Sequence, residues 1–282
     1  MEYGKLYIVA TPIGNLEDIT YRAINILQNV DIIAAEDTRH TLKLLNHYNI
    51  TKHLISYHRH NEDIKSDELL NKLKNGNNVA LVSDAGTPGI CDPGAIIIKK
   101  CLEQNIQVIP IPGACAFVNG LICSGLNTDA FLFLGFLPLN KKNRKYRLEQ
   151  IENSKQTIIL YEAPHKLQTT LEDLQKILGD RKIVIARELT KIHEEFIRGN
   201  VDEVIEKTKD IKGEIIILIE GIKEDFNELK KEKFEKFTLE EHYKYYEKQG
   251  FDKKEIIKKI AKDRNVSKNE IYKYFLNFRD IP

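Results

Sequence analysis

The fold of this chain is decided by one segment, which reads Val82-Ser83-Asp84-Ala85-Gly86-Thr87-Pro88-Gly89-Ile90-Cys91-Asp92-Pro93-Gly94. It follows the apolar run 79–82, so a strand ends here and a long loop begins. Glycine tolerates backbone angles and close ligand approach that other residues do not, proline stiffens the chain, and aspartate supplies a hydrogen-bond acceptor. An ordinary strand-to-helix connection, the plain alternative, needs only a few residues. The length and composition of this loop therefore favour a cradle for a small molecule.

The first half of the chain repeats one unit, an apolar strand followed by a helix. Five strands are predicted, at 5–11, 31–35, 54–57, 79–82 and 106–111. Parallel strands need crossover helices, so five such units in succession predict an α/β domain with a parallel sheet that helices cover on both faces. In sheets of this kind, ligands gather outside the carboxyl ends of the strands.

The helices between these strands are predicted from their caps and their apolar spacing. Asn15, with Asp18 three residues later, is expected to begin the first helix. The apolar positions of that helix are Ile19, Ala23, Ile26, Leu27 and Val30. The apolar positions of the second helix are Leu42, Leu45 and Tyr48. Further helices are expected up to about residue 74, over 95–104 and after 116.

Polar or glycine-rich residues follow all five of these strands. The clusters are 12–15, 36–39, 58–62, 83–94 and 112–116. Because the carboxyl ends of parallel strands share one edge of the sheet, all five clusters are expected to reach one crevice. The chain has neither a G-x-G-x-x-G nor a G-x-x-x-x-G-K-[ST] pattern, which speaks against ordinary dinucleotide and P-loop nucleotide binding. The expected ligand is nucleoside-sized and held by several loops.

A second group of apolar strands is predicted at 131–136, 157–160, 182–186 and 215–219. They predict a second α/β domain that closes over the first and leaves a cleft between the two, a common place for ligands. From about residue 225 the composition changes to Lys, Glu and Tyr. The predicted domains are therefore 1–118, 119–223 and 224–282.

The C-terminal piece carries three helix-start patterns. These are Thr238 with Glu241, Asp252 with Glu255, and Ser267 with Glu270, each of the capping-box type. Three short helices are expected, and residues 257–272 resemble a helix-turn-helix. One interpretation is RNA contact by this piece; the other is a packing appendage that never meets nucleic acid.

A basic run lies between the second group of strands. Residues 141–147 contain five cations and Tyr146, which suits contact with a phosphate backbone and stacking on a base, or else a solvated surface. The candidate RNA contacts are Lys141, Lys142, Arg144, Lys145, Arg147 and Arg187.

Composition limits the possible partners. The 282 residues carry 30% charged side chains and a net charge of +1, so any nucleic-acid surface must be local. No apolar run approaches membrane-spanning length and no signal-peptide pattern is present, which predicts a soluble, cytoplasmic protein.

Cys91, Cys101, Cys115 and Cys123 form no C-x-x-C pair, so buried reduced thiols are expected instead of disulfides or a zinc site.

Six motifs together resemble a known family. They are A-T-P-I-G-N at 10–15, E-D-T-R at 36–39, S-D-A-G-T-P at 83–88 with D-P-G at 92–94, G-F-L-P at 135–138, Y-E-A-P-H at 161–165 and A-R-E-L-T-K at 186–191. The chain is similar over nearly its full length to the ribosomal RNA small subunit methyltransferase I family. These are 16S rRNA cytidine 2′-O-methyltransferases within the tetrapyrrole-methylase, or class III methyltransferase, superfamily.

The resemblance implies S-adenosylmethionine bound in the cleft between two α/β domains, 16S rRNA or the 30S subunit as the substrate, and a homodimer. The cofactor residues that it implies are Pro12, Ser83, Asp84, Ala85, Gly86, Gly113, Cys115, Ala116, Glu162 and Leu189. Two positions depart from the family pattern, which commonly has Ser in place of Cys91 and Arg in place of Lys166. A lost guanidinium at residue 166 would weaken one phosphate contact.

A ribose 2′-hydroxyl is a poor nucleophile near neutral pH, so a nearby base is expected. The candidates follow strands on one edge and are Glu36, Asp37, His58, His60 and Glu62, with Arg39 and Arg187 as clamps for phosphate or carboxylate. Glu36 and Asp37 are equally suited to capping the next helix. His58 and His60 lack a third ligand at metal-binding spacing, so no metal site is predicted.

Three functions compete at this stage. The first is 2′-O-methylation of rRNA. The second keeps S-adenosylmethionine but has a tetrapyrrole or another small molecule as the acceptor, against which the basic run and the terminal helices speak. The third is a non-catalytic ribosome-binding protein on the same scaffold. A test of S-adenosylmethionine binding separates the non-catalytic protein from the two methyltransferases. An assay of methyl transfer to 30S particles and to porphyrin precursors separates the rRNA methyltransferase from the small-molecule one.

Overall fold

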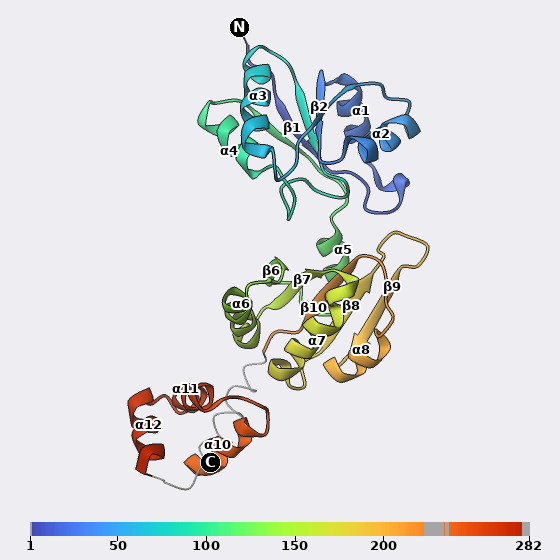
Figure 1. Ribbon diagram of the computed structural model, residues 1–282. Coiled ribbons are helices and arrows are strands. Elements are labelled where there is room, and N and C mark those ends of the chain that lie inside the picture. The colour runs from blue at the N-terminus through green and yellow to red at the C-terminus, as the bar shows by residue number, and fades with distance from the viewer. Residues whose placement is uncertain (1, 223–233, 235–236, 278–282) are drawn as a thin grey trace.

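The computed structural model describes residues 2–222, 234 and 237–277. Two five-stranded sheets are followed by a group of short helices (Figure 1). The predicted α/β architecture with a C-terminal helical region is confirmed. The predicted boundary at 223 and 224 lies outside the described residues, and the domain limits stay predictions. Within the described part of the chain, no helix is long and apolar enough to cross a membrane.

The first sheet is entirely parallel and has the strand order β3-β2-β4-β1-β5. Its strands are β1 (Leu6–Val9), β2 (Ile32–Ala35), β3 (His53–Ser56), β4 (Val79–Val82) and β5 (Val108–Ile111). The central strands β2 and β4 are buried at every position, which explains their unbroken apolar sequence. All five predicted strands and their parallel arrangement are confirmed.

Helices cover both faces of this sheet, as predicted. They are α1 (Tyr21–Asn29), α2 (Thr38–His47), α3 (Glu62–Lys74) and α4 (Ala95–Glu103). Leu27 of α1 and Leu45 of α2 pack with Ile33 on one face. On the opposite face, α3 and α4 pack against Leu81, and Figure 1 shows these two helices on the other side of the strands. The helices cover the two faces of the sheet and leave the edge at the carboxyl ends of its strands uncovered by them.

Two expectations about these helices were wrong. Asn15 caps only a short 3₁₀ helix, Leu16–Asp18, by accepting a hydrogen bond from the Glu17 amide at 3.1 Å. The cap of α1 is Thr20, whose hydroxyl accepts from the Ala23 amide at 3.1 Å, because a second capping residue follows five positions later. In α2, Leu44 is buried beside Leu45, whereas Leu42 is 48% exposed.

The second sheet is mixed, with the order β6-β7-β10-β8-β9. Its strands are β6 (Phe131–Phe136), β7 (Thr157–Glu162), β8 (Ile183–Arg187), β9 (Glu195–Gly199) and β10 (Ile215–Ile219). Among its four pairs of neighbouring strands, β6–β7 is parallel and the other three are antiparallel. Strand β9 was not predicted, because only Ile197 of its five residues is buried at the edge of the sheet.

Four helices flank the second sheet. Helices α6 (Lys141–Asn153), α7 (Pro164–Leu178) and α8 (Val201–Lys207) share one apolar core with it. Helix α5 (Ala116–Ile122) directly follows the first sheet, yet its Leu121 packs with Ile216 on the opposite face of the second sheet. Ile13, from the loop after β1, joins the same cluster. The two sheets are therefore joined by shared apolar packing as well as by the chain.

The three predicted C-terminal helices are confirmed as α10 (Leu239–Glu247), α11 (Lys253–Asp263) and α12 (Lys268–Asn277). Thr238 and Glu241 form both hydrogen bonds of a capping box. The Asp252 and Ser267 side chains accept from the amides of Glu255 and Glu270 at 2.8 and 3.2 Å. The helices share a separate apolar core, and Figure 1 shows them beyond the second sheet.

Candidate functional site

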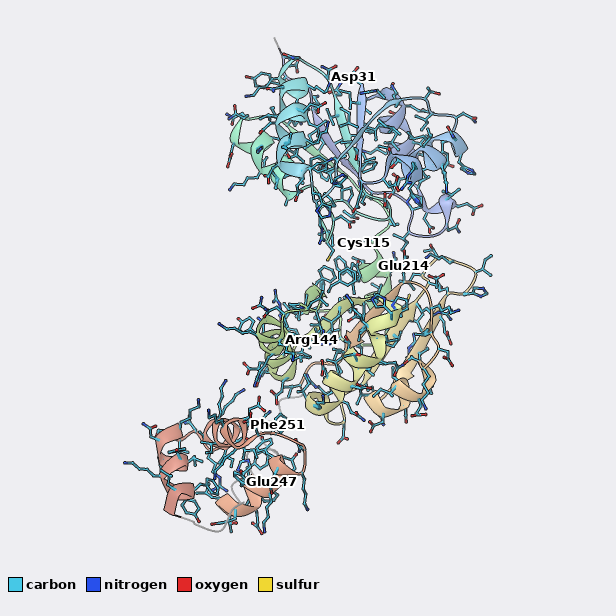
Figure 2. All side chains as sticks on the ribbon, in the orientation of Figure 1. Asp31, Cys115, Arg144, Glu214, Glu247 and Phe251 are labelled. Atoms are coloured by element: carbon cyan, nitrogen blue, oxygen red, sulfur yellow. The ribbon has the colours of Figure 1, made fainter. Side chains whose placement is uncertain are left out.

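A cavity of about 490 Å³ lies between the two sheets. From the first sheet it is lined by Ile13, Glu36, Asp84, Gly86, Asp92 and Cys115, among others. From the second it is lined by Tyr161, Glu162, Ala186, Leu189, Glu214 and Ile216, among others. Figure 2 shows Cys115 at the junction of the two sheets, with Glu214 facing it from the second. The predicted cleft therefore exists, and residues far apart in sequence meet in it.

The loop after β4 is fastened to the loop after β1. Thr11 donates its amide to the Gly86 carbonyl at 2.9 Å and accepts from the Gly86 amide at 3.1 Å. Gly86 has φ of +81°, and a Cβ there would lie 3.2 Å from Ile13 Cγ2. The hydroxyl of the buried Ser83 donates to the same Gly86 carbonyl at 3.3 Å. These bonds fix the backbone of residues 84–87 against the cavity.

Three carboxylates, Glu36, Asp84 and Asp92, line one part of the cavity wall. Burial, reinforced by Asp92 and Asp84, raises the pKa of Glu36. Burial also raises the pKa of Asp92, an effect opposed by the Arg59 cation. Asp84 accepts a hydrogen bond from the Asp37 amide at 3.0 Å. This part of the cavity is suited to a cation or to a group that loses a proton.

Of the predicted base candidates, Glu36 lines the cavity and the others do not. Asp37 caps α2 by accepting from the Arg39 amide at 2.8 Å, and its hydrogen bonds with Arg39 lower the pKa of the Asp37 carboxyl far below its ordinary value. His58 and His60 stack edge to face with ring centroids 5.9 Å apart. Glu62 is the first residue of α3. None of residues 58–62 lines the cavity, but Arg59 donates to the carbonyl of the lining residue Cys91.

Most of the predicted cofactor residues line the cavity, namely Asp84, Ala85, Gly86, Cys115, Ala116, Glu162 and Leu189. The other three, Pro12, Ser83 and Gly113, are not among the lining residues. A Cβ on Gly113 would lie 2.9 Å from Ala10 Cβ, so this glycine permits close packing of two loops. Sequence reasoning missed the lining residues Tyr161 and Ile216. They belong to apolar strands, and no sequence signal shows which side of a strand faces a cavity.

Glu162 is held by a chain of buried hydrogen bonds. Its carboxylate accepts from the Ala163 amide at 2.9 Å and from the Thr170 hydroxyl at 2.6 Å. Arg144 donates to the Thr170 hydroxyl at 3.0 Å and to Asp173 at 2.9 Å. Arg144, predicted as an RNA contact, is therefore partly buried, with its guanidinium bound within the protein, and it positions a cavity residue through Thr170.

The other predicted RNA contacts differ in their surroundings. Lys145 forms an ion pair with Glu255, and Arg147 donates to Gln150 at 2.8 Å. Arg187 donates to the Lys212 carbonyl at 2.7 Å and to Glu195 at 3.2 Å. Lys141 and Lys142 begin α6 and are exposed. The run is thus the start of a helix, and its first two lysines face solvent.

Replacing Thr170 with valine tests the buried chain. Valine keeps the shape of threonine but leaves the Glu162 carboxylate, which is 5% exposed, without one of its donors. Loss of one partner of a buried polar group costs about 1–3 kcal/mol. We expect the free energy of unfolding in urea to fall by that amount. Thr157→Val, which also removes a buried hydroxyl but one bonded to the Asn127 carbonyl at 2.7 Å, is the control: it should also lose stability, whereas only Thr170→Val, which frees the cavity residue Glu162, should weaken cofactor affinity.

All four cysteines are free. Cys101 is fully buried, whereas Cys91 and Cys115 are half-buried at the cavity. Burial raises the pKa of both cavity thiols. Cys123 is exposed, so the expectation of a buried thiol was wrong there, because it follows the last turn of α5 at the surface. The residues that the structure describes contain no group of three side chains suited to a metal ion.

The model of the family described as Tetrapyrrole (Corrin/Porphyrin) Methylases matches residues 5–205. The chain belongs to this family. Two relatives of this methylase are both named ribosomal RNA small subunit methyltransferase I. That of Halalkalibacterium halodurans is 48% identical over 96% of this chain and 94% of the relative. That of Bacillus subtilis is 48% identical with the same coverage.

Solved structures share the fold of this methylase. The methyltransferase CobJ matches with a TM-score of 0.60 at 18% identity, covering 77% of this chain and 94% of that one. A Thermus thermophilus uroporphyrin-III C-methyltransferase, complexed with S-adenosyl homocysteine, matches with a TM-score of 0.55 at 16% identity, covering 77% and 97%. These structures share the fold of this chain, and the family match over residues 5–205 confirms the predicted tetrapyrrole-methylase superfamily.

Proposed function

We propose that this methylase transfers a methyl group from S-adenosylmethionine to the ribose 2′-hydroxyl of a cytidine in 16S rRNA, in the cytoplasm. The observation that carries the proposal is the cavity between the sheets, in a chain 48% identical to relatives named as rRNA small subunit methyltransferases. The cytidine and the 2′-oxygen come from the motif resemblance. The runner-up, a small-molecule acceptor, is supported only by the names of structures that share the fold at low identity.

The residues present fit the proposed cofactor. A volume of about 490 Å³ lies within the usual range for small-molecule sites, about 300–1,000 Å³. Ile13, Leu189 and Ile216 offer apolar contact for an adenine ring, and Gly86 allows close approach of the backbone. Asp84 is a suitable partner for the cationic part of the molecule. When bound, S-adenosylmethionine supplies a methyl group on a positively charged sulfur, which is reactive by itself.

The protein's own chemical task is to position the acceptor and to take its proton. Glu36 lines the cavity, and no hydrogen bond to its carboxylate is present among the described contacts. Of the other two carboxylates of the wall, Asp84 accepts a hydrogen bond from the Asp37 amide at 3.0 Å, and Asp92 lies close enough to the Arg59 cation for that charge to oppose the raised pKa of Asp92. We assign Glu36 as the group that would accept the 2′-hydroxyl proton when a bound S-adenosylmethionine gives up its methyl group and leaves as the neutral thioether. The raised pKa of Glu36 makes it a stronger base than an ordinary glutamate.

The proposal is tested by transfer of a tritiated methyl group. The purified protein is incubated with labelled S-adenosylmethionine and either 30S particles, free 16S rRNA or porphyrin precursors. We expect label in rRNA, and mapping of alkali-resistant linkages is expected to place it on a cytidine 2′-oxygen. Label on a base nitrogen or carbon would refute the 2′-O chemistry, and label in the porphyrin alone would support the runner-up.

The exposed start of α6 is proposed to contact rRNA. Changing Lys141 and Lys142 together to alanine removes two cations that have no described protein partner. We expect RNA affinity at low salt to fall about 3- to 10-fold and its salt dependence to weaken, as for lost phosphate contacts. Filter binding at several salt concentrations measures both. Affinity for S-adenosylmethionine should not change, and an unchanged RNA affinity would assign these lysines to the solvated surface.

Homodimer formation also remains a proposal. Val118 and Ile122 of α5 and Phe131 of the edge strand β6 are apolar and 41–63% exposed. A second copy would bury them. Light scattering at several protein concentrations, with Ile122→Asp as the variant, decides between monomer and dimer.

A further inference from the structure

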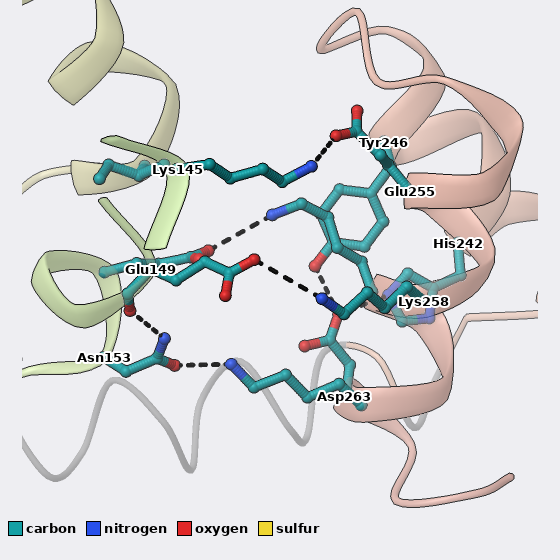
Figure 3. A network of polar contacts seen from close by, with 12 residues as sticks. Lys145, Glu149, Asn153, His242, Tyr246, Glu255, Lys258 and Asp263 are labelled. Carbon is teal, nitrogen blue, oxygen red and sulfur yellow. Dashed lines mark hydrogen bonds and ion pairs between the residues drawn. The ribbon is translucent and has the colours of Figure 1, made fainter. Parts of the chain in front are cut away.

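Helices α6 and α11 lie side by side and are joined by a row of polar contacts (Figure 3). Lys145 pairs with Glu255 at one end of the row. Lys258 and Lys259 of α11 then face Glu149 and Glu152 of α6 at 3.6 and 3.5 Å, and Lys262 donates to Asn153 at 2.8 Å. The residue numbers rise together along both helices, so the two helices run in the same direction. The lysines of α11 therefore meet a row of acceptors along α6.

The two lysine–glutamate contacts differ in exposure: the Lys259 and Glu152 side chains are 23% and 22% exposed, and the Lys258–Glu149 contact is more solvated. The Lys258 and Glu149 side chains are 59% and 46% exposed, and the same residues line a groove of about 650 Å³. Both lysine–glutamate distances exceed the roughly 2.7–2.9 Å of a direct charge-assisted hydrogen bond. Exposed ion pairs of this kind contribute little stability and are screened by salt. An anion of higher charge density can therefore replace Glu149 at small cost, and the less exposed Glu152 at a larger one.

The α11 lysines have the spacing of a phosphate-binding row. Lys258 lies four positions and Lys259 three positions before Lys262, so each of them is a neighbour of Lys262 on the helix surface. Lysine binds phosphate as a point charge, and several lysines in a row neutralise successive phosphates and release their counterions. Glutamate carboxylates on α6 occupy the places that phosphates would take. By contrast, Arg144 and Lys145 of the 141–147 run already have partners within the protein, Asp173 and Glu255, and Arg144 is also partly buried.

We propose that Lys258, Lys259 and Lys262 form a second RNA-binding row, on which Glu149 and Glu152 stand in for RNA phosphates in the free protein. This inference depends on the proposed function, because it assumes that the substrate is rRNA. On binding, phosphates displace the two glutamates, and the acidic side of α6 thus competes with RNA. This competition lowers non-specific RNA affinity without any contact to the cavity.

The decisive experiment removes the competing charges. The variant Glu149→Gln, Glu152→Gln is compared with Glu172→Gln, Asp180→Asn, which removes two exposed carboxylates that have no described contact with α11. Binding to a 16S rRNA fragment is measured at low salt. We expect the first variant to bind about 3- to 10-fold more tightly than the control variant. Equal or weaker binding, in a variant with an unchanged melting temperature, would overturn the proposal.

A second variant tests the row itself. Lys258→Ala, Lys262→Ala leaves Lys259 in place, because its ammonium also lies 4.3 Å from the Phe251 ring centroid. We expect the slope of log affinity against log salt to decrease by about 1.4, since each phosphate contact on a single strand contributes about 0.7. When the two alanine changes are combined with Glu149→Gln and Glu152→Gln, the tighter RNA binding expected of the glutamine variant should disappear. Methyl transfer by the unchanged protein is assayed separately: its absence refutes the proposed function, whereas transfer without these binding effects refutes only the lysine row.

Discussion

Replacing Glu36 with glutamine is expected to lower kcat for methyl transfer about 10²- to 10⁴-fold, the usual contribution of a positioned general base. Glutamine keeps the size and the hydrogen-bonding oxygen of glutamate but cannot accept the 2′-hydroxyl proton. Affinity for S-adenosylmethionine and for rRNA should change little, because Asp84 and the residue 84–87 backbone still line the cavity. Single-turnover transfer to 30S particles, with cofactor binding measured by calorimetry, separates the two effects.

The pH dependence gives a second measurement on the same residue. Burial raises the folded-state pKa of Glu36 above 4.5, so the base becomes protonated, and transfer declines, at a higher pH than an ordinary glutamate would allow. The raised value also means that the folded state disfavours the ionised carboxylate. Stability therefore decreases as the pH rises from the ordinary pKa through the raised one. Glu36→Gln removes that penalty, and we expect unfolding at pH 7 to require the same or slightly more denaturant.

Asp37→Asn is the matched control for Glu36→Gln. Asp37 is the neighbouring acid, but it caps α2 and lies outside the cavity lining. Asparagine is also a good capping residue, so the change should cost less than about 1 kcal/mol of stability. Asp37→Asn should leave unchanged the decline in the rate of methyl transfer at low pH, which we attribute to protonation of Glu36. If Glu36→Gln retains that decline as well, another group takes the proton and our assignment is wrong.

Much of the fold was predictable because strong periodic signals coincide with burial. The runs that form β2 and β4 are apolar at every position because helices cover both faces of the sheet. Strand β9 carries no such signal: it lies at the edge, and only Ile197 is buried. The start of α1 was misplaced because Asn15 and Thr20 both have capping side chains, and only tertiary packing decides which one begins the longer helix.

The site was predictable in part for a related reason. Loops after parallel strands must share one edge, so Glu36, Asp84 and Cys115 could be expected in one place. Sequence spacing does not show which polar side chains find partners inside the protein. Arg144 and Lys145 have the same charge as Lys141, yet the first is bound to Thr170 and Asp173 and the second to Glu255. Their partners lie 26 to 110 residues away along the chain, beyond the reach of a local pattern.

Replacing Gly86 with valine is expected to weaken S-adenosylmethionine binding about 10- to 100-fold. The residue has φ of +81°, a conformation that β-branched side chains rarely adopt. Its Cβ would also lie 3.2 Å from Ile13 Cγ2, and Ile13 lines the cavity. Overpacking of this kind costs about 1–3 kcal/mol, which corresponds to the stated change in Kd if the shift displaces residues 84–87 from the cofactor. Calorimetric titration of the folded variant measures it.

Gly125 supplies the matched control, because it isolates backbone strain from crowding. Its φ of +79° is nearly the same as that of Gly86, but a Cβ there would have no atom within 4 Å. Gly125→Val should therefore lose stability through its backbone, roughly 1–2 kcal/mol, and keep its cofactor affinity. A loss of affinity in the Gly86 variant alone would place the cofactor against the loop after β4. If both variants lost affinity equally, general destabilisation would account for the effect, and the cofactor would have to bind elsewhere.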